Sequence, residues 1–217
     1  MTNKLVWDQT GERKYETGVE QPAFYPMTGN TYGDGVAWNG FTGFTQRPTG
    51  AEATAIYAND SKYGELLSNE EFEGTITAYT YPDEFAQCDG SAELAEGVTI
   101  GQQERKTFGL VYKTLVGNDT EGTNYGYKLH IVYGCKAKPS EKAYKTVNDN
   151  PEAIEFSWEV TTTPVSVTGH KPTSHLEIDS KTVQADKLKK LEEALYGGTN
   201  KPKLLTPDEV LTMINAA

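Results

Sequence analysis

Alternation of apolar and polar side chains is the clearest pattern in this chain, and it predicts β-strands. Residues 72–81 place Phe72, Ile76 and Ala78 on one face, as a half-buried strand requires. The loop at 117–124 is rich in Gly, Asn and Asp, so the strands on either side of it are expected to form a hairpin. The two strands of this hairpin, 105–116 and 125–138, show the same alternation. Two further stretches, 153–163 and 174–179, also alternate.

The second strand of this hairpin has one apolar and one polar face. Its apolar face consists of Tyr127, Leu129, Ile131, Tyr133 and Cys135, and its polar face of Lys128, His130 and Lys136. We therefore expect Cys135 to be a small core residue and His130 to be a solvated surface residue.

Turn-forming residues dominate the first part of the chain. Residues 1–50 are rich in Gly, Pro and Thr, which permits only short extended pieces. Residues 41–63 show no sustained period and are expected to form a long loop, and such loops in compact domains are usually functional. Residues 82–90 begin with Pro82 and two acids and end at Gly90, which predicts a short helix.

Helical spacing replaces alternation in the last part of the chain. Leu188, Leu191 and Leu195 stand three and four residues apart, and Gly-Gly follows, which predicts an amphipathic helix. A second helix is expected after Thr206, because Thr206 and Glu209 have the spacing of a capping box. It is too short to be stable alone, so its apolar residues need a docking surface: Val210, Leu211 and Ile214.

These patterns predict a mainly β fold: a β-sandwich or partly open barrel with a short packed helix and a C-terminal helical tail. We expect a β domain at 1–180 and a helical tail at 181–217. The charges divide at the same point. The domain has 14 basic and 26 acidic residues, a net charge of −12, whereas the tail has 6 and 5, a net charge of +1.

The net charge of −11 argues against gripping a nucleic-acid backbone, which requires a basic surface. No apolar run approaches the roughly 20 residues that span a membrane. The N-terminal residues lack the apolar core of a secretory signal, so we expect the chain to fold in a cytoplasm. Two cysteines do not make a disulfide framework.

Residues able to perform chemistry are few. His170 and His175 flank a turn-like stretch and could hold a metal, but together with His130 they are better explained as surface histidines. Cys88 and Cys135 are expected to be buried rather than nucleophilic.

Two other patterns also lead to no site. Residues 101–107 resemble a phosphate-binding loop, but Arg105 stands where the second Gly is needed and a strand follows. Acids are plentiful, yet no arrangement singles out a hydrolytic pair. We predict no catalytic, cofactor-binding or metal-binding residue, and a hydrolase is the weakest of the functions considered.

Several stretches, in order along the chain, resemble major tail tube proteins of long-tailed phages that infect Gram-positive bacteria. They are GVAWNG (35–40), AYTYPDEFAQCDG (78–90), FGLVYKT (108–114), YGYKLHIVY (125–133) and FSWEVTTTP (156–164). The resemblance continues through the leucine helix and Thr206. No single stretch is diagnostic, but the ordered set is fairly specific.

This resemblance implies a structural virion protein made in the bacterial cytoplasm and located in the phage tail. Six copies would form a ring, and rings would stack into a hollow tube through which phage DNA passes without specific binding. The implied partners are further copies of the chain and the tape-measure, tail terminator and distal tail proteins. A lumen lined with carboxylates would repel DNA, although the acidic charge could equally serve solubility.

The long loop and the tail helices are the expected contacts between rings. Exposed apolar side chains usually mark interaction sites. The candidates are Phe41, Phe44, Tyr57, Tyr63, Val210, Leu211 and Ile214. The loop aromatics could instead fold back as a lid on their own subunit.

A different class of function is a carbohydrate-binding or adhesion β-sandwich on a virion surface. Aromatic side chains beside acids, as around Trp38 or at residues 79–81, would suit stacking on sugars.

Overall fold

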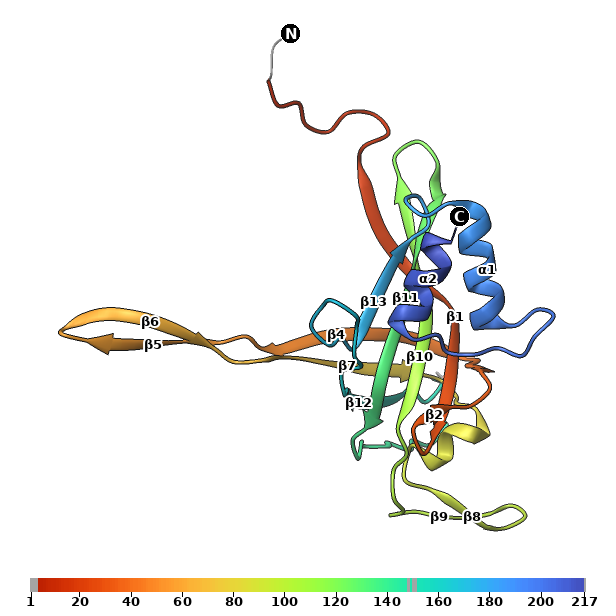
Figure 1. Cartoon of the computed structure of the whole chain (residues 1–217). Coiled ribbons are helices and arrows are strands. Elements are labelled where there is room, and N and C mark those ends of the chain that lie inside the picture. The colour runs from red at the N-terminus through yellow and green to blue at the C-terminus, as the bar shows by residue number, and fades with distance from the viewer. Residues whose placement is uncertain (1–3, 148, 150–151, 217) are drawn as a thin grey trace.

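The structure, a computed structural model, describes residues 4–147, 149 and 152–216, so the outermost ends of the predicted domain and tail (1–3 and 217) lie outside the described residues. Strands make up 48% of the chain and helices 12%, which confirms the mainly β prediction. One antiparallel sheet of nine strands dominates (Figure 1). Its strands are β1 (Lys14–Thr28), β2 (Thr31–Tyr32), β3 (Val36–Ala37), β4 (Phe41–Gly50), β7 (Glu70–Ala78), β10 (Phe108–Asn118), β11 (Gly122–Ala137), β12 (Phe156–Thr161) and β13 (His175–Asp179).

The other elements are two hairpins and three helices. They are β5 (Ala53–Ala58) with β6 (Ser61–Leu67), β8 (Ala92–Ala95) with β9 (Val98–Ile100), the 3₁₀ helix η1 (Asp83–Gln87), α1 (Ala185–Tyr196) and α2 (Pro207–Asn215). The short helix expected at 82–90 is therefore a 3₁₀ helix, and Gly90 follows it with a φ of +78°, as a helix stop should.

The long sheet bends into a partly open sandwich because β11 belongs to both halves. Most of β11 pairs with β10 and β13, whereas its last residues, Lys136 and Ala137, pair with β12. Strands β12, β7 and β4 then continue the second half. The strand path ends at β2 on one side and β4 on the other, so the sheet stays open.

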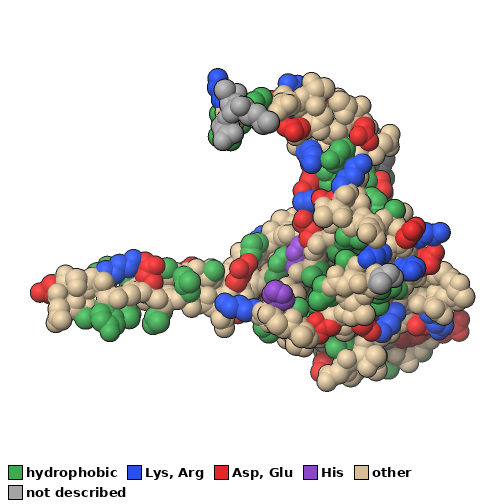
Figure 2. Space-filling view, turned by 45° about the horizontal axis from the view of Figure 1, so that its top comes forward, with side chains coloured by type: hydrophobic (Ala, Val, Ile, Leu, Met, Phe, Trp, Pro, Cys, Tyr) green, Lys and Arg blue, Asp and Glu red, His purple; other side chains and the backbone are tan. Residues whose placement is uncertain are grey.

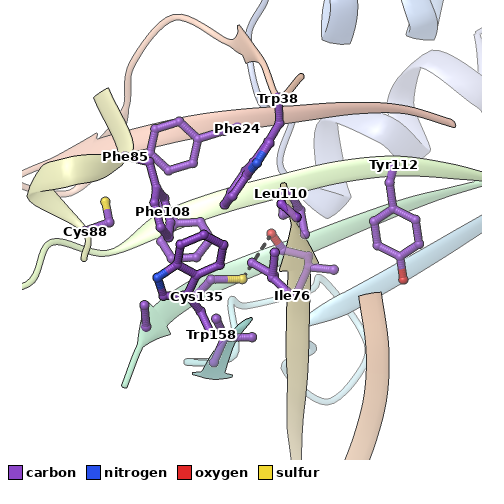
Figure 3. Packing of buried hydrophobic residues seen from close by; sticks show 14 residues of the cluster. Phe24, Trp38, Ile76, Phe85, Cys88, Phe108, Leu110, Tyr112, Cys135 and Trp158 are labelled. Atoms are coloured by element: carbon purple, nitrogen blue, oxygen red, sulfur yellow. Dashed lines mark hydrogen bonds between the residues drawn. The ribbon is translucent and has the colours of Figure 1, made fainter. Parts of the chain in front are cut away.

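The space between the two halves is filled mainly by aromatic rings (Figure 3). Trp38 and Trp158 lie 5.9 Å apart, and Phe85 from η1 lies 4.6 Å from Trp38 and 5.2 Å from Trp158. Such edge-to-face and tilted pairs add about 0.5–1.5 kcal/mol each to the burial of their area. This core therefore joins η1 to both halves of the sandwich.

A second core lies on the outer face of the β1–β10–β11–β13 half, beneath α1 and α2 (Figure 1). Leu188, Leu191 and Leu195 are buried there, as the spacing predicted. Buried tyrosine hydroxyls tie the helical segment to the sheet: Tyr25 donates to the carbonyl of Leu195, and Tyr133 to the carbonyl of Leu205 at 2.8 Å. The division into 1–180 and 181–217 stays a prediction, although the two segments share this core.

A bulge in β11 corrects one detail of the face assignment. Gly134 has a φ of +61°, and a Cβ there would lie 2.3 Å from the carbonyl oxygen of Thr163. The irregularity sends Tyr133 into the core beneath the helices and Cys135 into the core between the sheet halves. Cys135 is fully buried as expected, but not on the face shared by Leu129 and Ile131.

The expectation for the first 63 residues was wrong in two respects. Residues 1–50 contain two long strands, β1 and β4, and not only short pieces. Residues 41–63 are not a loop: they form β4, β5 and the start of β6. Bulges in β1 at Thr17–Val19 and Glu20–Ala23 interrupt its alternation, which hides the strand from a period-based reading.

Candidate interaction site

The hairpin formed by β5 and β6 projects from the body as an extension of β4 and β7 (Figure 1). Strands β4 and β7 pair from Phe41–Ala78 to Gly50–Glu70. The chain then bends, and two hydrogen bonds hold the two sides together before β5 pairs with β6: the Ser68 amide donates to the Glu52 carbonyl, and the Glu52 amide donates to Ser68 Oγ. The bend is made by Gly50 and Ala51, with φ of +81° and +53°.

A tight turn closes the hairpin at its tip. Asn59 and Asp60 both have positive φ, +48° and +57°. Two consecutive left-handed residues match the type I′ turn, whose twist suits a two-stranded ribbon, and Asn and Asp tolerate this conformation better than most residues. The hairpin is thus encoded locally, although its strands escaped the period analysis.

The described part of the chain leaves the apolar side chains of this hairpin uncovered. Figure 2 shows the hairpin as a thin projection with hydrophobic atoms along its surface. The exposed fractions are 38% for Ile56, 73% for Tyr57, 77% for Tyr63, 61% for Leu66 and 72% for Leu67. Because large exposed apolar patches mark interaction sites, the hairpin is the main candidate site of this molecule.

The four aromatic residues proposed as contacts in 41–63 fall into two groups. Tyr57 and Tyr63 are on the projecting hairpin and exposed. Phe41 and Phe44 are at its root and pack against the subunit's own core, with Phe41 5.6 Å from Trp38 and Phe44 5.3 Å from Tyr112. Phe41 and Phe44 therefore cover their own subunit, as in the lid interpretation. Tyr57 and Tyr63 stay available for contact with another molecule.

The three residues proposed in the tail also divide. Val210 is buried and Ile214 is partly buried, and both belong to the core beneath the helices. Only Leu211, 48% exposed, remains available on the surface of α2. The predicted capping box is present: Thr206 Oγ1 accepts from the Glu209 amide, and Glu209 Oε2 accepts from the Thr206 amide.

Sequence reasoning missed two further exposed apolar segments. The N-terminal arm carries Leu5, Val6 and Trp7, exposed by 72%, 64% and 72%. The β8–β9 hairpin carries Leu94, Val98 and Ile100, also exposed. The Leu-Val-Trp run was a visible signal for the first, whereas the three-residue strand β9 is too short for periodicity to detect.

The histidines are not arranged as expected. His130 is buried rather than solvated. The sequence suggested that His175 could pair with His170, but in the structure His175 contacts His130, with His130 Nδ1 3.1 Å from His175 Nε2. Thr114 Oγ1 lies 2.8 Å from the other nitrogen of His130, and the Tyr112 ring stacks at 4.7 Å. Burial, and then the neighbouring His175, lowers the pKa of His130 to about 4; burial also lowers the pKa of His175.

A hydrogen bond between the two rings accounts for this pair. In this bond one facing nitrogen carries the proton and the other accepts it. Among the described residues, no group of three or more His, Cys, Asp or Glu side chains could hold a metal.

The cysteines are buried in the sandwich core. Burial raises the pKa of Cys88 to about 12 and raises that of Cys135 still further. Both thiols therefore stay protonated at neutral pH and are poor nucleophiles.

The buried carboxylate of Asp89, just after η1, joins β12 to the segments around Arg105 and Lys142. Asp89 accepts from Trp158 Nε1 at 3.0 Å and pairs with Lys142 and with Arg105, whose Nη1 is 3.5 Å away. Arg105, the residue that ruled out a phosphate loop, thus has a structural partner.

No known family model matches the chain, and no curated protein matches it. Within the described ranges, no helix has both the length and the apolar character needed to cross a membrane.

Proposed function

We propose that this chain is a structural subunit that assembles with copies of itself into a tube of the phage-tail type. The observation that carries the proposal is the β5–β6 hairpin, which holds its exposed apolar residues away from the body, where the subunit's own core cannot cover them. The ordered sequence resemblance to tail tube proteins gives the kind of assembly. In this proposal, the hairpin reaches an adjacent copy.

The open sheet supports the same proposal. Strands at the edge of a sheet present unpaired backbone groups that favour pairing with another chain. Here β4 is an edge strand for its whole length, Phe41–Gly50. Assembly in rings of six, with partner tail proteins and an acidic lumen, is the finer part of the proposal.

The carbohydrate-binding alternative loses one of the residues that suggested it. Trp38 is 2% exposed, and its indole nitrogen donates to the carbonyl of Thr80 at 2.8 Å, so its ring is not free to stack on a sugar. Tyr79 remains exposed, at 53%.

The test compares the full chain with a variant in which residues 51–69 are replaced by Asn-Gly, joining β4 to β7 by a tight turn. This cut leaves Phe41 and Phe44 in place. We expect the full chain to form rings or tubes at high concentration, and the variant to melt at nearly the same temperature but to form neither rings nor tubes. Light scattering, negative-stain microscopy and thermal melts give the readouts. A full chain that remains monomeric at every concentration, even with the tape-measure protein added, would contradict the proposal.

A further inference from the structure

Two features at opposite ends of the long strands are complementary in charge. At one end, the β8–β9 hairpin (Ala92–Ile100), here called the tip hairpin, extends beyond η1 (Figure 1). At the other end, the start of β1, the paired ends of β10 and β11, and the end of β13 with Lys181 after it line a pocket of about 350 Å³. We call it the end pocket.

The end pocket is cationic on an acidic protein. Its lining includes Lys14, Lys128 and Lys181 against Glu16 and Asp179, a net charge of +1, whereas the whole chain carries −11. Lys128 is engaged by Glu16.

Lys14 and Lys181 form no ion pair with any carboxylate in the described part of the chain. Instead their ammonium groups lie 5.3 Å and 4.4 Å from the ring centroid of Tyr125, so two cations and an aromatic face are presented together.

The tip hairpin has the opposite character. Its charged residues are Glu93 and Glu96, both exposed and without a cationic partner among the described residues. Between and beyond them stand the exposed aliphatic side chains of Leu94, Val98 and Ile100. A narrow ribbon with two carboxylates and three apolar side chains suits a small pocket in which two ammonium groups beside Tyr125 form no ion pair with a described carboxylate.

We propose that the tip hairpin of one copy docks into the end pocket of the next. A single chain cannot make this contact with itself, because the two features lie at opposite ends of the molecule (Figure 1). Such a head-to-tail contact is heterologous and propagates from copy to copy, into a ring if the rotation closes and into an open filament if it does not. It rests on the proposed self-assembly and adds a second direction of contact, since the β5–β6 hairpin projects sideways as an extension of β4 and β7 (Figure 1).

The test uses two charge-reversed variants. One has the tip reversed, Glu93→Lys with Glu96→Lys, and the other has the pocket reversed, Lys14→Glu with Lys181→Glu. All four side chains are exposed, so both variants should fold and melt like the wild type. Each variant alone places like charges in contact, so we expect its self-association, measured by sedimentation velocity at low salt, to weaken by about tenfold or more.

Mixing the two variants is the decisive step. The reversed tip then meets the reversed pocket, and the native tip of the second variant meets the native pocket of the first, so association should return to within about threefold of wild type. Failure of the mixture to recover, or unchanged association of each variant alone, overturns the contact while leaving the tube proposal intact. A wild-type chain that does not associate at all overturns both.

A covalent readout gives an independent check. Val98→Cys in one preparation and Tyr125→Cys in another should form a mixed disulfide under mild oxidation, because the native Cys88 and Cys135 are buried and unreactive. Tyr57→Cys, on the sideways hairpin, is the control in place of Val98→Cys. Equal cross-linking of the control would contradict the proposed docking.

Discussion

The outer face of the central sheet and the β5–β6 hairpin carry similar apolar side chains but differ in what covers them. On the sheet, Leu129 and Ile131 are fully buried beneath α1 and α2. On the hairpin, Tyr63 and Leu67 are more than 70% exposed. Burial of apolar area is worth about 25 cal/mol per Å² wherever it occurs. The body therefore uses its apolar residues to fold, whereas those of the hairpin can contribute only when another molecule covers them.

Removing the helical cover should have the largest effect. Deletion of residues 181–217 would uncover the apolar face that includes Tyr25, Val111 and Tyr133. We expect the truncated chain to lose its cooperative melt and to aggregate, because the buried sheet residues of this core would face water and native proteins are only marginally stable. Circular dichroism melts and solubility measure this. A soluble, folded product would instead support the predicted domain boundary after residue 180.

Single truncations sharpen the same contrast. Leu195→Ala in α1 should lower the free energy of unfolding by about 2–5 kcal/mol, because it leaves a cavity in a closed core. Leu67→Ala on the hairpin should change it by less than about 0.5 kcal/mol. Urea unfolding followed by tryptophan fluorescence compares them. Equal losses would mean that the hairpin is folded back onto the body in solution.

The contrast also shows what the sequence could reveal. Residues in regular elements with one buried face were predicted well: Ile76 and Ala78 in β7, and the three leucines of α1. Each of these side chains is placed by a period and covered by its own chain. The capping box of α2 was equally visible, because it depends on residues three apart.

The failures have physical causes of a different kind. Strands β5 and β6 are exposed on both faces, so no burial pattern marks them. The bulge at Gly134 reverses the face of Cys135, and a φ value cannot be read from periodicity. His130 looked polar because it alternates with apolar residues, but β11 is covered on both sides. Of the candidate contacts, Tyr57, Tyr63 and Leu211 stay exposed, whereas the others are buried or partly buried by tertiary packing.

The buried histidine pair predicts a pH dependence confined to the body. His130 is surrounded by Thr114, His175, Tyr112 and the charged Glu177, with Lys128 and Glu16 nearby. Its pKa is about 4 in the folded chain, against about 6.5 when unfolded. The unfolded state therefore binds the proton more readily. The stability due to neutral His130 is complete above pH 6.5 and is lost as the pH falls toward 4, by at most about 3 kcal/mol.

Two variants isolate this contribution. His130→Gln cannot titrate, so its stability relative to wild type should improve as the pH falls from 6.5 to 4.5. The exposed His170 provides the matched control, and His170→Gln should keep the wild-type slope. Chemical unfolding at several pH values measures both. Parallel pH profiles for all three proteins would show that the buried pair does not titrate as expected.

The smallest expected effects come from two single substitutions, one at the N-cap of α2 in the body and one in the turn of the β5–β6 hairpin. Thr206→Ala removes the cap of α2, which typically costs about 1 kcal/mol. Asn59→Ala forces alanine into the left-handed turn between β5 and β6, at a similar cost of about 1 kcal/mol. Helix α2 packs on the sheet through Val210, so the loss of its cap should lower the global melting temperature by a few degrees. Among the described residues, β5 and β6 pair only with each other, so Asn59→Ala should open the turn between them locally and leave the global melt unchanged. Hydrogen exchange at the β5–β6 amides would detect the fraying. Should Asn59→Ala lower the melting temperature as much as Thr206→Ala, the hairpin and the body would unfold as one cooperative unit.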